Sequence, residues 1–282
     1  MNWITDNKIP LGSWMESFVD WLTTNAAGFF DALSLSLEWL ILIGVDTFKW
    51  MPPALPILMT AAVAWLLHRS IPLVIFVVAA LLLILNLGYW DEMLETFVLV
   101  LAATALSVMI GVPIGILAAH RPWLYTFMRP VLDLMQTIPT FVYLIPTLVL
   151  FGLGVVPGLI STIIFAIAAP IRLTYLGIRS VPEELIEAGK AFGATQTKLL
   201  LKVELPAAMP NIMAGITQCI MLSLSMVVIA ALVGADGLGK PVIRALNTVN
   251  ISQGFEAGLA IVLVAIILDR LCKAPASQNK EG

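Results

Sequence analysis

Residues 234–241, GADGLGKP, have the spacing in this chain that most resembles a site for chemistry. Gly234, Gly239 and Lys240 match the glycines and the lysine of a phosphate-binding loop, whose backbone N–H groups and ammonium hold a nucleotide. The next residue is Pro241 instead of the serine or threonine that ligates Mg²⁺, and no strand precedes the loop. We therefore expect a turn or a protein contact here, and no nucleotide site.

The second feature is a polar segment at residues 187–206, EAGKAFGATQTKLLLKVELP, which separates two apolar runs. Just before it, Ser180 and Glu183 have the spacing of a capping box, and Pro182 suits the first turn of a helix. This helix is expected to end at Gly193, because glycine readily adopts the left-handed conformation that stops a helix.

A second short helix is expected directly after that glycine. Thr195 can cap it, and the helix QTKLLLKVE would end at Leu205–Pro206, where the next apolar run begins. Ala188 and Gly189 are small enough to let another surface approach closely, and Phe192 adds an apolar side chain. A helix–turn–helix that binds a partner is predicted, with a solvated connector as the alternative.

Apolar helices must position these residues. Hydrophobic residues make up 60% of the chain, charged residues make up 12%, and the mean hydropathy is +0.99. These values exclude an ordinary soluble domain and indicate an all-α polytopic membrane protein. A cleavable signal peptide is not expected, since acidic residues stand where its basic stretch would be. About seven spans are expected, at residues 52–67, 71–89, 93–119, 130–151, 156–176, 207–233 and 256–271.

The first 50 residues are expected to lie along the bilayer surface. In residues 11–25, apolar and aromatic side chains recur at helical spacing and acidic ones occupy the other face, as in an interfacial amphipathic helix. A second helix, around residues 27–49, carries three acidic residues and is expected to lie in the same way. A simple anchor and a more specific role remain open for both helices.

The distribution of basic residues predicts an orientation. If residues 177–206 are cytoplasmic, eleven of the fifteen lysines and arginines lie on the cytoplasmic side, and Lys8, Lys49, Lys240 and Arg244 lie outside. Such an excess follows the positive-inside rule. The N-terminus is therefore expected outside and the C-terminus in the cytoplasm.

Few ionisable residues fall inside the expected spans. Asp133 follows Arg129 by four residues, so a pair within one helix is expected there, with a gating role as the alternative. His68 and His120 stand beside arginines at span ends, where interfacial positions without metal binding are expected. A proton-coupled carrier would need a series of buried carboxylates, which the spans lack.

The polar segment resembles a known motif. Glu187-Ala188-Gly189, Gly193, Val203 and Leu205-Pro206 reproduce the spacing of Glu-Ala-Ala, three residues, Gly, nine residues, Ile, one residue, Leu-Pro. That pattern marks the cytoplasmic loop of permease subunits in bacterial ABC importers; here glycine replaces the second alanine and valine replaces isoleucine. The stretches MQTIPTFVYLIP, PIRLTYLGIRSVP and LSMVVIAALVGADGLG are similar to permeases for glycine betaine, proline betaine and choline. The resemblance covers residues 90–271.

The resemblance implies a type I ABC importer transmembrane domain in the bacterial inner membrane, with no catalytic residues, bound cofactor or metal of its own. It implies a homodimer, two copies of a separate ATP-binding subunit that holds the ATP, and an extracytoplasmic substrate-binding protein. In that family the loop is a coupling helix that docks on the ATPase. The coupling residues carried over are Glu187, Ala188, Gly189, Gly193, Leu205 and Pro206.

The translocation path is expected around QTIPTFVYLIP. Gln136, Thr137, Thr140 and Tyr143 are candidates for lining it, with helix packing as the alternative. A quaternary ammonium is best held by an aromatic cage, but no tryptophan cluster occurs in the core spans. Selectivity is therefore expected to reside in the substrate-binding protein.

The predicted organisation has four parts: interfacial helices (1–50), two accessory spans (51–90), a permease core (91–272) with the coupling loop 178–206, and a cytoplasmic tail (273–282). The predicted function is ATP-driven import of choline, glycine betaine or proline betaine. The alternative is an ion-coupled secondary carrier or channel for small osmolytes, which would show inverted repeats or ionisable groups at the membrane midplane. Lipid is an expected partner and nucleic acid is not.

Overall fold

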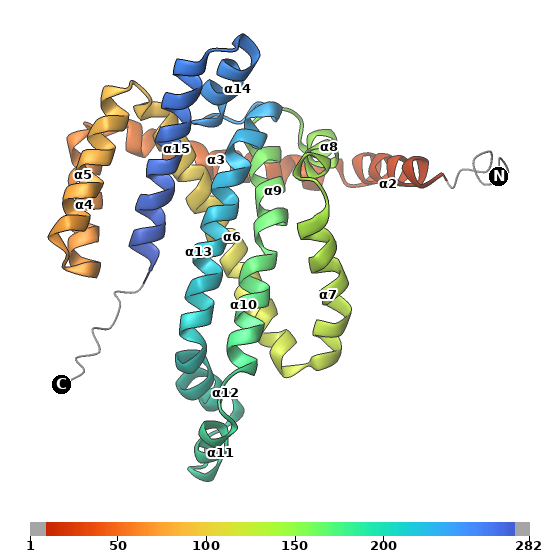
Figure 1. Ribbon diagram of the computed structural model, residues 1–282. Coiled ribbons are helices and arrows are strands. Elements are labelled where there is room, and N and C mark those ends of the chain that lie inside the picture. The colour runs from red at the N-terminus through yellow and green to blue at the C-terminus, as the bar shows by residue number, and fades with distance from the viewer. Residues whose placement is uncertain (1–9, 274–282) are drawn as a thin grey trace, which may run out of the picture.

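The structure, a computed structural model, describes residues 10–273, and within this range the chain forms helices and connecting turns without strands (Figure 1). The predicted all-α membrane fold is confirmed. Lys8 and all of the predicted tail except Lys273 lie outside the described residues.

Five helical stretches are long and apolar enough to cross a bilayer. They are Ala27–Trp50, Trp90–His120, Val155–Arg179, Gln196–Val233 and Ile251–Cys272. A bent pair of helices, α7 (Pro122–Thr137) and α8 (Thr140–Phe151), makes a sixth if it counts as one span. Helices α4 (Ala54–His68) and α5 (Ile71–Asn86) are apolar but have only 15 and 16 residues, so the expected number of seven exceeds what length supports.

Three helices form the centre of the molecule by very close packing. Helix α10 (Ala168–Arg179) packs on α6 (Trp90–His120) and α13 (Leu205–Ala230). A Cβ atom added at Gly115 would lie 2.7 Å from both the Ile171 carbonyl oxygen and the Thr174 Cβ. Gly177 and Gly215 likewise meet neighbouring helices, and we call these three glycines the glycine seam. Such close helix approach through small residues is the usual way to stabilise helix contacts inside a membrane, where burial from water contributes little.

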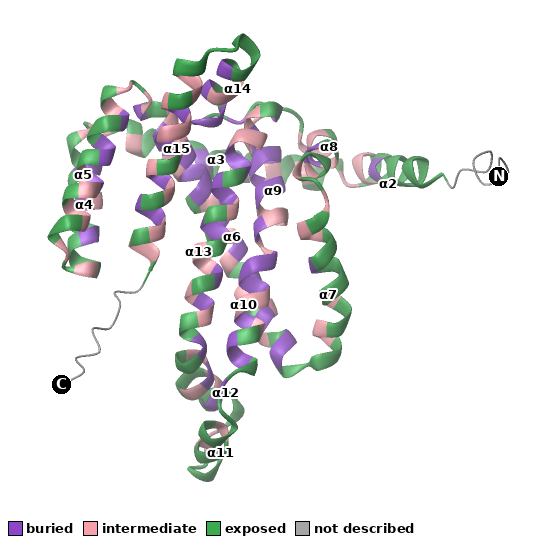
Figure 2. Cartoon of the chain, viewed as in Figure 1, coloured by how far each residue is buried: buried purple, intermediate pink, exposed green. Residues whose placement is uncertain are grey.

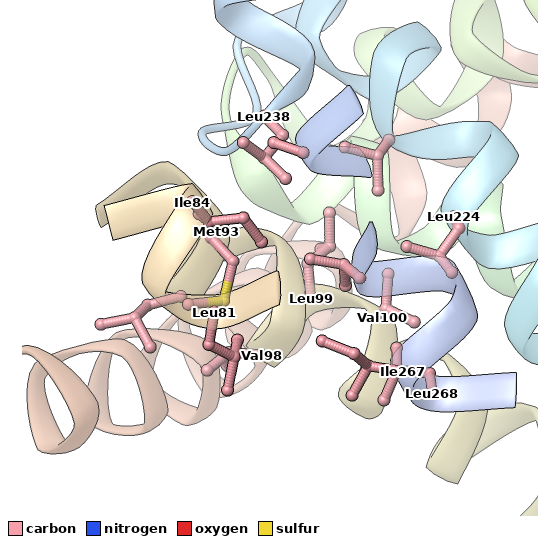
Figure 3. Packing of buried hydrophobic residues seen from close by; sticks show 14 of the residues in the cluster. Leu81, Ile84, Met93, Val98, Leu99, Val100, Leu224, Leu238, Ile267 and Leu268 are labelled. Carbon is pink, nitrogen blue, oxygen red and sulfur yellow. The ribbon is translucent and has the colours of Figure 1, made fainter. Parts of the chain in front are cut away.

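A larger apolar cluster ties the outer helices to this centre (Figure 3). Leu81 and Ile84 of α5 pack with Met93 and Leu99 of α6. The same cluster includes Ile267 of α15 (Ile251–Cys272), so the α4–α5 hairpin and the last span share one core.

The two N-terminal helices are α2 (Leu11–Asn25) and α3 (Ala27–Trp50), and both run across the direction of α10 and α13 (Figure 1). Helix α2 exposes Trp14, Phe18 and Trp21, as expected of an interfacial helix. Helix α3, which was expected to lie along the bilayer surface, is long and apolar enough to span by length and composition, but its direction across α10 and α13 (Figure 1) agrees with the expected position. Its three acidic residues are too few to lower its apolar character below that of a span.

Two polar elements mark opposite ends of the bundle (Figure 1). Helix α14 (Gly239–Thr248) lies at one end and α11 (Glu183–Ala191) at the other. The stretch 234–241, which resembles a phosphate loop, is a turn that leads into the first residues of α14. The Leu238 N–H donates to the Thr96 hydroxyl at 2.8 Å, and Lys240 pairs with Asp236. Its lysine and this N–H are therefore engaged by the protein itself.

Candidate functional site

The coupling segment, residues 178–206, begins differently from the sequence prediction. Helix α11 starts at Glu183 with Pro182 as its N-cap, and no side chain caps it. The Ser180 hydroxyl instead donates to the Gly177 carbonyl at 2.9 Å, so the predicted capping box is wrong. Pro182 has extended backbone angles that lead the chain away from α10, and this separates α11 from the preceding helix.

The turn after α11 follows the prediction closely. Gly193 has φ +73°, a left-handed conformation. The Ala194 N–H donates to the Gly189 carbonyl at 3.1 Å, and the Gly193 N–H donates to the Lys190 carbonyl at 2.9 Å. This pair of bonds is the Schellman arrangement, in which otherwise unpaired helix-end carbonyls are satisfied. The turn is therefore fixed by local hydrogen bonds rather than by tertiary packing.

The second helix starts as predicted and ends elsewhere. The Thr195 hydroxyl accepts from the Lys198 N–H at 3.4 Å and caps α12 (Gln196–Leu199). A π-helical turn, Leu200–Glu204, then leads directly into α13. The predicted end at Leu205–Pro206 is wrong: the helical run from Gln196 continues to Val233, and Pro206 lies in the first turn of α13, directly after the π-helical turn.

Two small residues of the segment have different surroundings. A Cβ at Gly189 would lie 2.7 Å from Leu199 Cδ1 and 3.5 Å from Val203 Cγ2, so the glycine lets α11 pack on the chain that follows it. This contact gives a reason for glycine where the family pattern has alanine. Ala188 and Glu187 are exposed on α11.

The coupling segment lies beyond the end of the spans, and most of α11 is exposed (Figure 2). Phe192 is 92% exposed at the turn, and Leu185 and Leu201 are also exposed. Large apolar side chains on a polar protrusion are typical of a surface that binds another protein. Of the predicted coupling residues, Glu187, Ala188, Gly193 and Pro206 are exposed, whereas Leu205 is half-buried.

The predicted path residues surround a sharp break in the chain. Helices α7 and α8 meet at 97° around Ile138–Pro139, so the predicted span 130–151 is not one straight helix. Gln136 and Thr137 lie before the break, and Thr140 and Tyr143 lie after it. The Tyr143 hydroxyl donates to the Met135 carbonyl at 2.6 Å and thereby braces the bend.

The charged residue in this region has a partner that the sequence did not predict. Asp133 of α7 pairs with Arg172 of α10 at 2.5 Å, and the predicted pair with Arg129 is wrong. The Asp133 side chain is 54% exposed, and the Arg172 Nε is buried without a hydrogen-bond partner among the described residues. Leu132 is the one buried residue of α7, which otherwise stands at the side of the bundle (Figure 2).

Sequence reasoning also missed Glu204, the unspecified position between Val203 and Leu205 in the family pattern. Glu204 is 6% exposed, and its Oε2 lies 2.8 Å from Nε2 of His120. An acidic residue at the edge of an apolar run was a signal for a buried partner, but one sequence could not identify that partner. Within residues 10–273, no group of three His, Cys, Asp or Glu side chains is placed to hold a metal.

The helical spans, the bent pair and the protruding coupling segment define the class of protein as an ABC importer transmembrane domain. A solved structure supports this: the chain resembles one titled as inward facing conformations of the MetNI methionine ABC transporter, with a TM-score of 0.55 and 25% identity, over 61% of this chain and 88% of that chain. Residues 111–273 match the family described as binding-protein-dependent transport system inner membrane component. The chain belongs to this family of permease subunits.

Curated relatives extend the match beyond the family region. The glycine betaine transport system permease protein OpuAB of Bacillus subtilis is 48% identical, over 94% of this chain and 93% of that protein. The glycine betaine/carnitine transport permease protein GbuB of Listeria monocytogenes is 45% identical, over 94% and 95%. The glycine betaine/proline betaine permease ProW of Escherichia coli is 41% identical, over 96% and 77%.

Proposed function

We propose that this chain forms the translocation path of an ATP-driven importer of quaternary ammonium compounds, with choline, glycine betaine and proline betaine as the substrate class. The observation that carries the proposal is the coupling segment: a Schellman turn at Gly193 that presents Phe192 beyond the spans, at the spacing of the ABC permease loop. The relatives named above support the substrate class.

The partner of the coupling segment is a separate ATP-binding subunit, present in two copies, which holds the ATP. Glu187 makes polar contacts at the groove of that subunit, and Ala188 allows close approach. Gly193 sets the turn between α11 and α12, and Leu205 and Pro206 pass the contact into α13. The exposure of Glu187, Ala188 and Phe192 supports this arrangement, because all three are available to a partner.

Two copies of this chain form the path, since one chain supplies half of it. The bent pair α7–α8 supplies the lining, with Gln136, Thr137, Thr140 and Tyr143 around the break. The support is that α7 is largely exposed in the single chain and carries polar side chains near a bend. Selectivity resides mainly in an extracytoplasmic binding protein, because similar permeases are named for different substrates, carnitine and proline betaine among them.

The N-terminus lies outside and the C-terminus in the cytoplasm, so that α11 is cytoplasmic and α14 is outside. Single cysteines at exposed positions of the two ends test this orientation: Phe192→Cys and Val249→Cys, in a chain whose Cys219 and Cys272 are replaced by serine. A membrane-impermeant thiol reagent added outside cells should label Val249→Cys alone. Labelling of Phe192→Cys instead would reverse the orientation.

The function is tested by purifying the chain with its ATPase and binding protein and reconstituting the complex in liposomes. Glycine betaine, proline betaine and choline are supplied one at a time, with methionine as the control, and ATP hydrolysis and uptake are measured together. At least one quaternary ammonium compound should stimulate both, and methionine neither. Uptake driven by an ion gradient without ATP would instead establish a secondary carrier.

A further inference from the structure

Glu204 is a buried acid at the base of the coupling segment. It is the last residue of the π-helical turn Leu200–Glu204, while its neighbours Leu201 and Lys202 are exposed. A π-turn changes the direction of the side chains that follow it and is found often at functional sites. Here it turns a carboxylate inward, away from the water that would solvate it, so the carboxylate requires a partner.

That partner is the last residue of α6. His120 Nε2 lies 2.8 Å from Glu204 Oε2, which is within ion-pair distance, and Oε2 has no hydrogen-bond partner within the described part of the chain. His120 Nδ1 lies 2.9 Å from the Ile116 carbonyl oxygen, which can only accept, so Nδ1 carries a proton. Nε2 is therefore the ring nitrogen that faces the Glu204 carboxylate.

The pair completes a chain of contacts from α11 to the bundle. Gly189 of α11 packs on Leu199, which directly precedes the π-helical turn, and on Val203, which is part of it. Glu204 ends that turn and reaches α6, the 31-residue helix that packs on α10, α13 and α9. Movement of α11 can therefore reach α13 through the backbone and α6 through the Glu204–His120 pair.

We propose that Glu204 and His120 are positioning residues for energy coupling: the pair ties the coupling segment to α6, so that α6 and α13 move together when the ATPase subunits close. This inference rests on the proposed function. Without the pair, α13 would still follow the coupling segment through its backbone, while α6 would follow only through its packing on α10 and α13. Breaking the pair should therefore lower the substrate transported per ATP more than it lowers ATP hydrolysis.

The test uses the reconstituted complex and four variants: Glu204→Ala, His120→Ala, the double variant, and the conservative Glu204→Gln, which keeps a hydrogen-bonding side chain. Each alanine variant should lower substrate per ATP about 5-fold or more, the lower end of typical coupling between sites. The double variant should be no worse than either single one, because one interaction is lost in all three. Glu204→Gln should retain most of the coupling.

Asp269→Asn is the matched control, because Asp269 forms an ion pair with Lys273 at 2.7 Å outside the coupling segment. This variant should transport as much substrate per ATP as the wild type. If Glu204→Ala fails to reach the membrane, His120→Ala and Glu204→Gln decide the question, because His120 is half exposed and its truncation leaves little cavity. Single effects that multiply in the double variant, or alanine variants that couple normally, would overturn the inference. A wild-type complex that does not couple ATP to uptake would instead overturn the proposed function.

Discussion

The glycine seam and the coupling segment both depend on glycine, but for different physical reasons. At Gly115 the backbone is helical and there is no room for a Cβ atom, which would lie 2.7 Å from a backbone oxygen. At Gly193 there is open space around the Cβ position, but φ is +73°. The seam is thus fixed by volume and the coupling turn by backbone conformation. The same substitution should therefore act on folding in one region and on transport in the other.

The largest effect is expected in the seam. Gly115→Leu would force α6 away from α10, because overpacking a tight contact costs about 1–3 kcal/mol or more. We expect little variant protein in the membrane fraction and a lowered thermal midpoint for what remains. Gly258→Leu is the matched control, since nothing lies within 4 Å of a Cβ there. Wild-type levels of Gly115→Leu would show that the seam can open at small cost.

The coupling turn should respond in transport rather than in folding. A side chain in the left-handed region costs about 1–2 kcal/mol, and valine is worse because it is β-branched. Gly193→Val should insert normally and lower the substrate transported per ATP, whereas Gly193→Asn should be milder, since asparagine tolerates this conformation. Unchanged transport by Gly193→Val would refute the coupling role of the turn.

The contrast between the regions becomes sharper when alanine and asparagine are compared at each glycine. In the seam, alanine should be the less harmful substitution because it is smaller. At Gly193, asparagine should be the less harmful one because of its backbone preference. The same order at both positions would contradict the distinction between volume and conformation.

A smaller effect is expected when the contact between α7 and α10 is weakened. This contact depends neither on a tightly packed glycine nor on a left-handed turn. Asp133→Asn removes the ion pair with Arg172, and for a pair this exposed the expected cost is about 1 kcal/mol. The loss should appear as faster thiol labelling of Val131→Cys on α7, with the overall thermal midpoint nearly unchanged. Asp236→Asn, which breaks the pair with Lys240 at the opposite end, is the control and should leave that labelling rate unaltered.

The smallest effect is expected at the cap of α12. Thr195→Ala removes a hydroxyl that accepts from the Lys198 N–H at 3.4 Å, and such a cap contributes about 0.5–1 kcal/mol. Transport per ATP should fall slightly, and Thr197→Ala, an exposed neighbour without a capping bond, should not change it. A loss at Thr195 as large as that at Gly193 would mean that the hydroxyl contacts the partner directly.

Features that depend on neighbouring residues were predictable from the sequence. The turn at Gly193 and the cap at Thr195 each need only a few adjacent residues, and both were located correctly. Most spans followed from the length of the apolar runs. By length and composition, however, α3 also qualifies as a span, and α4 and α5 are shorter than a helix that crosses a bilayer usually is.

Features that depend on distant residues were not predictable. Asp133 had a basic residue four positions away, which is a reasonable local partner, but its partner in the fold is 39 residues further along the chain. The Ser180 hydroxyl bonds to the Gly177 carbonyl, and α11 begins at Glu183 without a side-chain cap, a choice between two local options that the pattern could not decide. The sequence placed Pro139 at the break between α7 and α8, but a proline alone does not set the 97° angle.

The continuous helical run from Gln196 to Val233 has 38 residues and is therefore about 57 Å long, nearly twice the thickness of the hydrocarbon core. Its first residue, Gln196, follows directly after the coupling turn. A tilt of about 5° about one end would displace the other by roughly 5 Å, comparable to one helical turn. Under the proposed function, a small rotation imposed on the coupling segment would therefore become a displacement of several ångströms at the far end of α13.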